Sequence, residues 1–143
     1  MDNRNASAAD GWERMENKME MQEIIALVKE TKAFVDNRER AGHVKVKGLA
    51  DYVTQVDTDI QSFLARELGN RFPDIQFLGE EEGLHEMSGD TYWILDPIDG
   101  TTNLIHDYQH SVVSLALYEK GEITLGIIYD PFREDVYRAQ KGT

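Results

Sequence analysis

Hydrophobic residues recur at helical spacing in the first third of the chain. Met21, Ile24, Ile25, Val28 and Val35 lie at positions i, i+3, i+4, i+7 and i+14. This spacing places them on one face of an α-helix. The pattern therefore predicts an amphipathic helix over about residues 16–39, which ends before the glycine at position 42.

A second apolar stripe predicts a second helix, over about residues 57–71. Four apolar residues share one of its faces: Ile60, Phe63, Leu64 and Leu68. Either Thr54 or Asp57 is a suitable N-cap, and Pro73 follows the end of the helix. Between the two helices, residues 43–57 read as extended chain or loop.

Beyond residue 74 the periodicity changes to that of short strands. Five segments carry apolar runs bounded by turn residues: 75–78, 91–95, 111–118, 123–129 and 135–141. The last three form a meander, joined by turn residues at 119–122 and 130–134. Two helices followed by strands predict an α+β fold, in which the helices pack on one face of a mostly antiparallel sheet.

The first 14 residues lie outside this pattern. They are polar and small apart from Trp12, so we expect a disordered tail or an artefact of an upstream start. The remaining residues, 15–143, then form a single domain, as the chain length favours.

Charge narrows the range of partners for this domain. The chain has 15 Lys and Arg against 27 Asp and Glu, a formal net charge of −12. Nucleic acid is an unsuitable partner, because phosphate backbones are bound by clustered basic residues. Small anions would also be repelled unless cations lie between the like charges.

The absence of cysteine limits the possible chemistry, and the absence of membrane-spanning and signal segments bears on the cellular location. The sequence contains no cysteine, which excludes disulfides, zinc thiolate sites and cysteine nucleophiles. It has no run of about 18 apolar residues that could span a membrane, and its N-terminus lacks the order of a signal peptide. We expect a cytoplasmic protein with no membrane partner.

Two acids stand at the end of an apolar strand, in the stretch WILDPIDGTTN at residues 93–103. An ordinary turn would explain Pro97 and Asp99, but not why Asp96 ends the strand. If residues 97–98 instead form a tight corner, both carboxylates and the Ile98 carbonyl point into one space. These are the hard oxygen ligands that Mg²⁺ prefers.

The next residues, Gly-Thr-Thr-Asn at 100–103, predict a short helix that runs to about His106. The free amides at a helix N-terminus bind anions, and glycine allows a close approach. Carboxylates for a metal ion beside amides for a phosphate indicate phosphoryl chemistry assisted by a metal.

Other acids and histidines carry weaker signals. The glutamates at 80–82 follow the predicted strand 75–78. They are either a solvated charge run or a second set of acids brought to the same edge of the sheet. The acids within residues 51–57 are more simply a helix cap. His106 and His110 have zinc-like spacing but lack the HExxH context, and the serine signature GxSxG is absent.

Together these motifs resemble the inositol monophosphatase family, the magnesium-dependent, lithium-sensitive sugar phosphatase superfamily. The resemblance covers about residues 16–143 and implies a layered sugar-phosphatase-like fold. It rests on four segments in order: KGLADYVTQVD from Lys47, GEE from Gly79, WILDPIDGTTN from Trp93 and GIIYDPFREDVYRAQKG from Gly126.

The resemblance implies a metal role for each matching acid. Glu80, Asp96, the Ile98 carbonyl and Thr101 would surround a first metal ion and its water. Asp96 and Asp99 would bind a second ion, and Glu80 would also serve a third. The cofactor would be Mg²⁺, with two or three ions per site.

The resemblance also implies catalytic and substrate-binding residues. Thr101, paired with Asp57, would orient the attacking water, with Glu80 assisting. Lys47 would lie in a mobile loop near the site. Four residues would contact the substrate phosphate, two of them through the amides of Gly100 and Thr101: Asp99, Gly100, Thr101 and Thr102.

The implied reaction is direct attack of metal-activated water on inositol monophosphate or a related small sugar phosphate. The cations would explain how an acidic protein binds an anionic substrate. Bisphosphorylated sugars or nucleotides are alternative substrates, and a non-catalytic metal-binding or protein-interaction module is the alternative outside this class. We expect a homodimer for the full-length form.

The chain departs from the family pattern in length. Family members are longer, and their second half carries a further metal-binding aspartate in a Trp-Asp-x-Ala-Ala-Gly motif, which neither Trp12 nor Trp93 begins. We therefore expect an N-terminal portion or truncated product that is inactive by itself, with an open strand edge and an uncovered sheet face.

Overall fold

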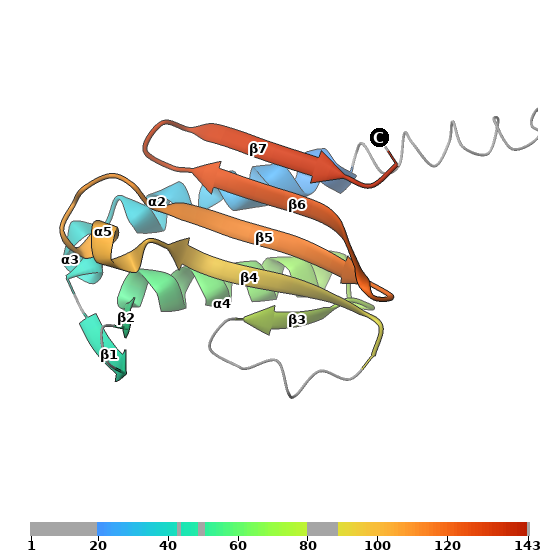
Figure 1. Ribbon diagram of the computed structural model, residues 1–143, viewed down its shortest axis with the longest axis horizontal. Coiled ribbons are helices and arrows are strands. Elements are labelled where there is room, and N and C mark those ends of the chain that lie inside the picture. Colours follow the sequence, from blue (N-terminus) through green and yellow to red (C-terminus); the bar gives the residue numbers. More distant parts are fainter. Residues whose placement is uncertain (1–19, 43, 49–50, 80–88, 143) are drawn as a thin grey trace, which may run out of the picture.

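The structure is a computed structural model that describes residues 20–42, 44–48, 51–79 and 89–142. Helices cover one face of a five-stranded sheet and lie behind it in Figure 1. The strands follow the order β3 (Gln76–Gly79), β4 (Thr91–Asp99), β5 (Val112–Glu119), β6 (Glu122–Asp130) and β7 (Asp135–Gln140). β3 pairs with β4 in parallel, and the other neighbours pair antiparallel. The predicted α+β class and mostly antiparallel sheet are confirmed.

The first predicted helix is interrupted twice, so the expectation of one continuous helix is wrong. A helix over residues 20–30 is followed by α2 (Lys32–Val35) and α3 (Arg38–Ala41). The Thr31 hydroxyl donates to the Val28 carbonyl oxygen. Asn37 is extended, with φ −82° and ψ 91°, and its side chain accepts from the amide of Arg40. Local hydrogen bonds of this kind compete with a continuous helix, and hydrophobic periodicity does not register them.

The second helix, α4 (Gln55–Arg71), forms where the sequence predicts it and begins with a capping box. The Thr54 hydroxyl accepts from the Asp57 amide, and the Asp57 carboxylate accepts from the Thr54 amide. Each side chain thus satisfies an amide that the helix leaves without a partner. An antiparallel hairpin, β1 (Val44–Gly48) with β2 (Asp51–Thr54), leads into this cap.

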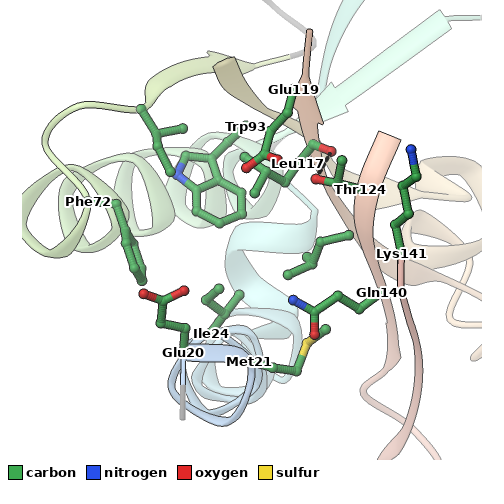
Figure 2. Close-up of a pocket in the computed structure, with 12 residues that line it drawn as sticks. Glu20, Met21, Ile24, Phe72, Trp93, Leu117, Glu119, Thr124, Gln140 and Lys141 are labelled. Atoms are coloured by element: carbon green, nitrogen blue, oxygen red, sulfur yellow. Dashed lines mark hydrogen bonds between the residues drawn. The ribbon is translucent and has the colours of Figure 1, made fainter. Parts of the chain in front are cut away.

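The hydrophobic core lies between the helices and the sheet and includes Trp93, Leu95, Ile98 and Leu104, each at most 3% exposed. A cavity of about 290 Å³ opens at one end of this layer, between the helix over residues 20–30 and the ends of β4 to β7 (Figure 2). It lies at the start of β4, whereas Asp96 and Asp99 lie in the last part of that strand and Thr101 follows it. The cavity is therefore separate from the candidate site.

Two further expectations concern the N-terminal tail and membrane-spanning segments. The predicted disordered tail, residues 1–14, lies outside the described residues. Within the part that the structure describes, no helix has the length and hydropathy needed to cross a membrane.

Candidate active site

Strand β4 runs through the two predicted metal-binding acids instead of ending before them. Asp96 lies opposite Ser114 and Asp99 lies opposite Val112, so a step of three residues on β4 faces a step of two on β5. One extra residue on one strand is a β-bulge, which bends the strand and re-aims its side chains. The expectation that the strand ends at Asp96 is therefore wrong, although the irregularity itself falls where a corner was predicted.

The bulge places both acids on the same face of the sheet. In a regular strand, residues three apart point to opposite faces. Leu95 and Ile98 are three apart, yet both are buried in the core beneath the sheet. The extra residue of the bulge brings Ile98 back to the face of the sheet that packs against the helices. Asp96 follows Leu95 and Asp99 follows Ile98, so both acids lie on the opposite face. Asp99 is exposed, and Asp96 is half-buried with its Oδ1 atom inaccessible to solvent.

Glycine is required at the turn that follows the bulge. Gly100 has φ 95° and ψ 42°, a left-handed conformation that other residues rarely adopt. A Cβ atom on it would lie 2.8 Å from the carbonyl oxygen of His110. The Ser111 hydroxyl donates to the Gly100 carbonyl oxygen at 2.7 Å. This turn starts the short helix α5 (Thr101–Ile105), which confirms the predicted helix.

The first residue of α5 contacts a carboxylate from a distant helix. The Oγ1 atom of Thr101 lies 3.2 Å from Asp57 Oδ1 and 3.1 Å from the Ile98 carbonyl oxygen. The hydroxyl has a single proton to donate, so these two acceptors compete for it. Asp57 Oδ2 accepts from the Thr54 amide at 2.9 Å and the Thr54 hydroxyl at 2.6 Å. Asp57 therefore caps α4 with one oxygen and faces Thr101 with the other.

The surroundings of Asp57 act on its acidity in two directions. Asp57 is only 3% exposed. Burial raises the pKa of the Asp57 carboxyl above its ordinary value, while hydrogen bonds from Thr54 and Thr101 act to lower it. The Asp57 carboxylate is held by Thr54 at the start of α4 and by Thr101 at the start of α5.

The structure does not describe every residue predicted for the site. Glu80 lies outside the described residues, as do the glutamates beside it, and nothing is known of the Lys47 side chain. The parallel pairing of β3 and β4 places Gly79 beside Leu95. Gly79 precedes Glu80 and Leu95 precedes Asp96 in the sequence, and the convergence of Glu80 with Asp96 stays a prediction.

The donor set suits a hard divalent cation but is small in the described residues. It consists of the Asp96 and Asp99 carboxylates and the Ile98 carbonyl oxygen, without thiolate or imidazole. Among residues 20–42, 44–48, 51–79 and 89–142, no group of three or more His, Cys, Asp or Glu side chains could hold a metal ion. A further acid, such as Glu80, would have to complete the site.

Two residues were not identified from the sequence, Asn103 and Ser111, whose side chains hold the Gly100 turn to the segment that follows α5. The Asn103 side chain donates to the His110 carbonyl oxygen at 2.8 Å, and Ser111 holds the Gly100 carbonyl. Both bonds tie the chain after α5 back to the start of that helix. Asn103 belongs to the conspicuous Gly-Thr-Thr-Asn string, but its partner cannot be read from linear spacing.

Comparison with known proteins gives a consistent result. The sequence profile of the Inositol monophosphatase family matches residues 13–143. Inositol-1-monophosphatases of Caulobacter vibrioides and Rhizobium meliloti are 42% and 40% identical over 101 and 100 residues. These alignments cover 69% of this chain but only 40% and 38% of those proteins. The chain thus spans less than half the length of these relatives.

Solved structures resemble the fold over most of the chain. An IMPase of Thermotoga maritima superposes with a TM-score of 0.74 and 30% identity, covering 89% of this chain and 49% of that one. An IMPase/NADP phosphatase complexed with Mg²⁺ and phosphate gives a TM-score of 0.78 and 28% identity, covering 87% and 49%. By this fold, these identities and a profile match over nearly its whole length, the chain belongs to the inositol monophosphatase family.

Proposed function

We propose that the chain is the metal-binding part of a Mg²⁺-dependent phosphatase for inositol monophosphate or a related small sugar phosphate. The observation that carries this proposal is the hydrogen bond between Thr101 and Asp57, which are 44 positions apart. This bond brings the buried carboxylate of Asp57 to the hydroxyl of Thr101. Thr101 follows Asp99 by two residues, and Asp99 shares one face of the sheet with Asp96. Such an arrangement can align a water molecule beside a metal-bound phosphate.

The acids hold the metal ions in this proposal. Asp96 and Asp99 of the bulge would hold the ions together with the Ile98 carbonyl oxygen, and Glu80, outside the described residues, would complete the site. Two or three Mg²⁺ ions bound there would lower the pKa of water and neutralise the charge of the phosphate. The net charge of −12 is then compatible with an anionic substrate.

Thr101 and Asp57 orient the attacking water. When the Thr101 hydroxyl donates its proton to Asp57, its oxygen lone pairs remain available to accept a hydrogen bond from water. Asp57 is buried and fixed by Thr54, so the hydroxyl has a defined direction. Glu80 assists at the same water. Positioning of this kind is the main contribution that protein groups make to phosphoryl transfer.

The start of α5 holds the substrate phosphate. The amides of Gly100 and Thr101 lie at the beginning of the helix, where amides have no acceptor within the helix. Thr102 and Asp99 complete the contacts. Relatives support this substrate class, since one related structure is of inositol monophosphate bound to a staphylococcal IMPase-II. We extend the proposal to a cytoplasmic homodimer for the full-length form.

Two alternatives follow from particular relatives. Related structures include an IMPase/NADP phosphatase and a staphylococcal IMPase-II with bound 2′-AMP, which favours nucleotides as alternative substrates. A Nus factor SuhB of Xylella fastidiosa is 39% identical over 100 residues, so the relatives include a protein that is not named as a phosphatase, and a non-catalytic metal-binding or protein-interaction module is the alternative to an enzyme.

Metal binding to Asp96 gives the sharpest test. We expect calorimetric titration with Mg²⁺ or Mn²⁺ to show binding to the wild-type chain, and Asp96→Asn to weaken it at least ~10-fold, because Asp96 would serve both ions of the proposed site. Asp74→Asn, at an exposed position in the turn after α4, is the matched control. Equal affinity of wild type and Asp96→Asn would refute the proposed metal site. Phosphate release from inositol monophosphate, NADP and 2′-AMP by the longest form of the protein that hydrolyses phosphomonoesters separates the substrate alternatives.

A further inference from the structure

We propose that Arg38 is a positioning residue for the site, because it holds the C-terminal end of the helix that carries Thr101. Its Nη1 atom donates to the Leu104 carbonyl oxygen at 2.7 Å, and its Nη2 atom donates to the Ile105 carbonyl oxygen at 3.3 Å. Leu104 and Ile105 are the last two residues of α5. The functional part of this inference rests on the proposed phosphatase activity.

Helix α5 is too short to define its own position. It has five residues, and isolated helices of fewer than about 12 residues are not stable in water. Its orientation therefore depends on contacts with the rest of the fold. Bonds from Asn103 and Ser111 hold its start to the chain that follows it. Contacts with more distant parts of the chain are the bond from Thr101 to Asp57, the burial of Leu104, and the bonds from Arg38 to the last carbonyl groups.

The bonds from Arg38 match what the end of a helix lacks. The last carbonyl groups of a helix have no amide partner within it, and they carry the negative end of the helix dipole. The Leu104 carbonyl oxygen accepts from the Asp107 amide, beyond the helix, at 3.2 Å, and its second lone pair accepts from Arg38. A guanidinium has five donors in a planar fork and a permanent positive charge, so it can satisfy two carbonyl groups at once. Arg38 also lies 3.9 Å from Asp107, a longer contact to a largely exposed carboxylate. The carbonyl bonds are the stronger part of the interaction.

Arg38 is itself fixed relative to Asp57. It is the first residue of α3, and the Asn37 side chain caps that helix. Two residues further on, Arg40 binds Asp59 of α4 through both carboxylate oxygens, at 2.6 and 3.1 Å. Asp59 is two residues from Asp57 on the same helix. α3, α4 and α5, grouped in Figure 1, are thus joined in a closed series of hydrogen bonds.

This closed series sets the distance between Thr101 and Asp57. If Arg38 released the carbonyl groups, α5 could pivot about its buried leucine, and the Thr101 hydroxyl and the Gly100 turn would move with it. A misplacement of about 1 Å at a reacting group can cost about 100-fold in rate. Substrate binding through several other contacts would change less. Loss of Arg38 should therefore lower kcat more than it raises KM.

The test compares Arg38→Gln and Arg38→Lys with Arg66→Gln, an exposed arginine in α4 whose side chain pairs with Glu67 and lies over the Phe63 ring. Amide hydrogen exchange of residues 101–106 and the thermal unfolding midpoint are measured on the 143-residue chain. We expect Arg38→Gln to speed exchange in α5 about 10-fold, with a midpoint within about 2 °C of Arg66→Gln. Arg38→Lys keeps the charge but has no planar fork, so it should restore part of the protection.

The kinetic arm uses the longest form of the protein that hydrolyses phosphomonoesters. There, Arg38→Gln should lower kcat about 10-fold with KM changed less than about 2-fold. Unchanged exchange in α5 would overturn the proposal, and so would faster exchange spread evenly over all helices. A wild-type protein without phosphatase activity would refute the proposed function alone, since the exchange arm still decides whether Arg38 holds α5.

Discussion

At the scale of single residues, the turn at Gly100 links Asp96 and Asp99, the acids proposed to bind metal, to Thr101, whose hydroxyl is proposed to orient water. The residue before it belongs to the bulge of β4, and the residue after it is Thr101. A left-handed backbone and a 2.8 Å approach to the His110 carbonyl leave no room for a side chain. Any larger residue would have to move either the bulge or α5, so the proposed metal binding and the proposed orientation of water both depend on this one position.

The role of Thr101 predicts a specific kinetic result. In the longest active form, Thr101→Ala should lower kcat by about 100-fold, since the hydroxyl acts on the water in the transition state. KM should change less than about 2-fold, because the backbone amide that holds phosphate remains. Thr101→Ser keeps the hydroxyl and should retain most of the activity. A raised KM with unchanged kcat would contradict the assigned role.

At the scale of elements, the bulge in β4 is the feature that hydrophobic patterning reads incorrectly. Pro97, Asp99 and Gly100 are all turn formers, so the pattern predicts that the strand ends before them. Whether such residues form a turn or a bulge depends on the neighbouring strand, and the pairing with β5 continues to Val112. The break at Asn37 has a similar cause, because a side-chain cap overrides an unbroken apolar stripe.

Elements with strong local signals were predictable. Helix α4, the three strands of the meander and α5 lie within about two residues of their expected bounds. Asp96, Asp99, Gly100 and Thr101 stand together in the sequence, so their proximity needs no tertiary information. The position of Asp57 in the site was not predictable in this way. Its local sequence explains it only as a helix cap, and its pairing with Thr101 was expected only from the family resemblance. Arg38 had no signal at all, because its acceptors are backbone atoms more than 60 positions away.

The contact between α3 and α4 predicts a pH-dependent effect on stability. The hydrogen bonds from Arg40 hold the pKa of Asp59 below its ordinary value. A depressed pKa means that the carboxylate stabilises the fold above its unfolded-state pKa of about 3.9 and loses this effect as the pH falls through the folded-state value. At pH 7, Asp59→Asn should lower the unfolding temperature by up to about 4 °C.

The difference between wild type and Asp59→Asn should shrink as the pH is lowered below 4 and disappear once Asp59 is protonated. Thermal unfolding followed by circular dichroism between pH 3 and 7 measures this. Asp74→Asn, which removes an exposed aspartate, controls for the change in net charge. A difference that stays constant over this range would show that the ion pair is not its cause.

At the scale of the whole molecule, the two faces of the sheet differ in their covering. The helices bury one face, whereas the other presents an apolar pair formed by Ile128 and Tyr137, which lie opposite each other on β6 and β7 and are 43% and 63% exposed. Ile123, 54% exposed, lies opposite Tyr118 on the same face. β7 is also an outer strand of the sheet. Exposed apolar side chains beside an outer strand favour association.

We therefore expect the 143-residue chain by itself to self-associate and to lack phosphatase activity. Association should occur through the uncovered face, so Ile128→Lys combined with Tyr137→Lys should shift the chain toward a monomer in light scattering. Ile75→Lys, at a half-buried position packed against the core, should instead reduce stability without changing the association of the folded fraction.

Activity should be absent for a separate reason. The described donors for metal are two carboxylates and a carbonyl group, and among the described residues no group of three or more His, Cys, Asp or Glu side chains could hold a metal ion. With Glu80 added, the second ion would still have only Asp96 and Asp99 from this chain, and the leaving group would lack a firmly held cation to offset its charge. The measurement is phosphate release from inositol monophosphate in millimolar Mg²⁺ on the sample used for light scattering. A monomer that turns over substrate at about 1 s⁻¹ or faster would refute both expectations and would mean that these residues alone build a sufficient site.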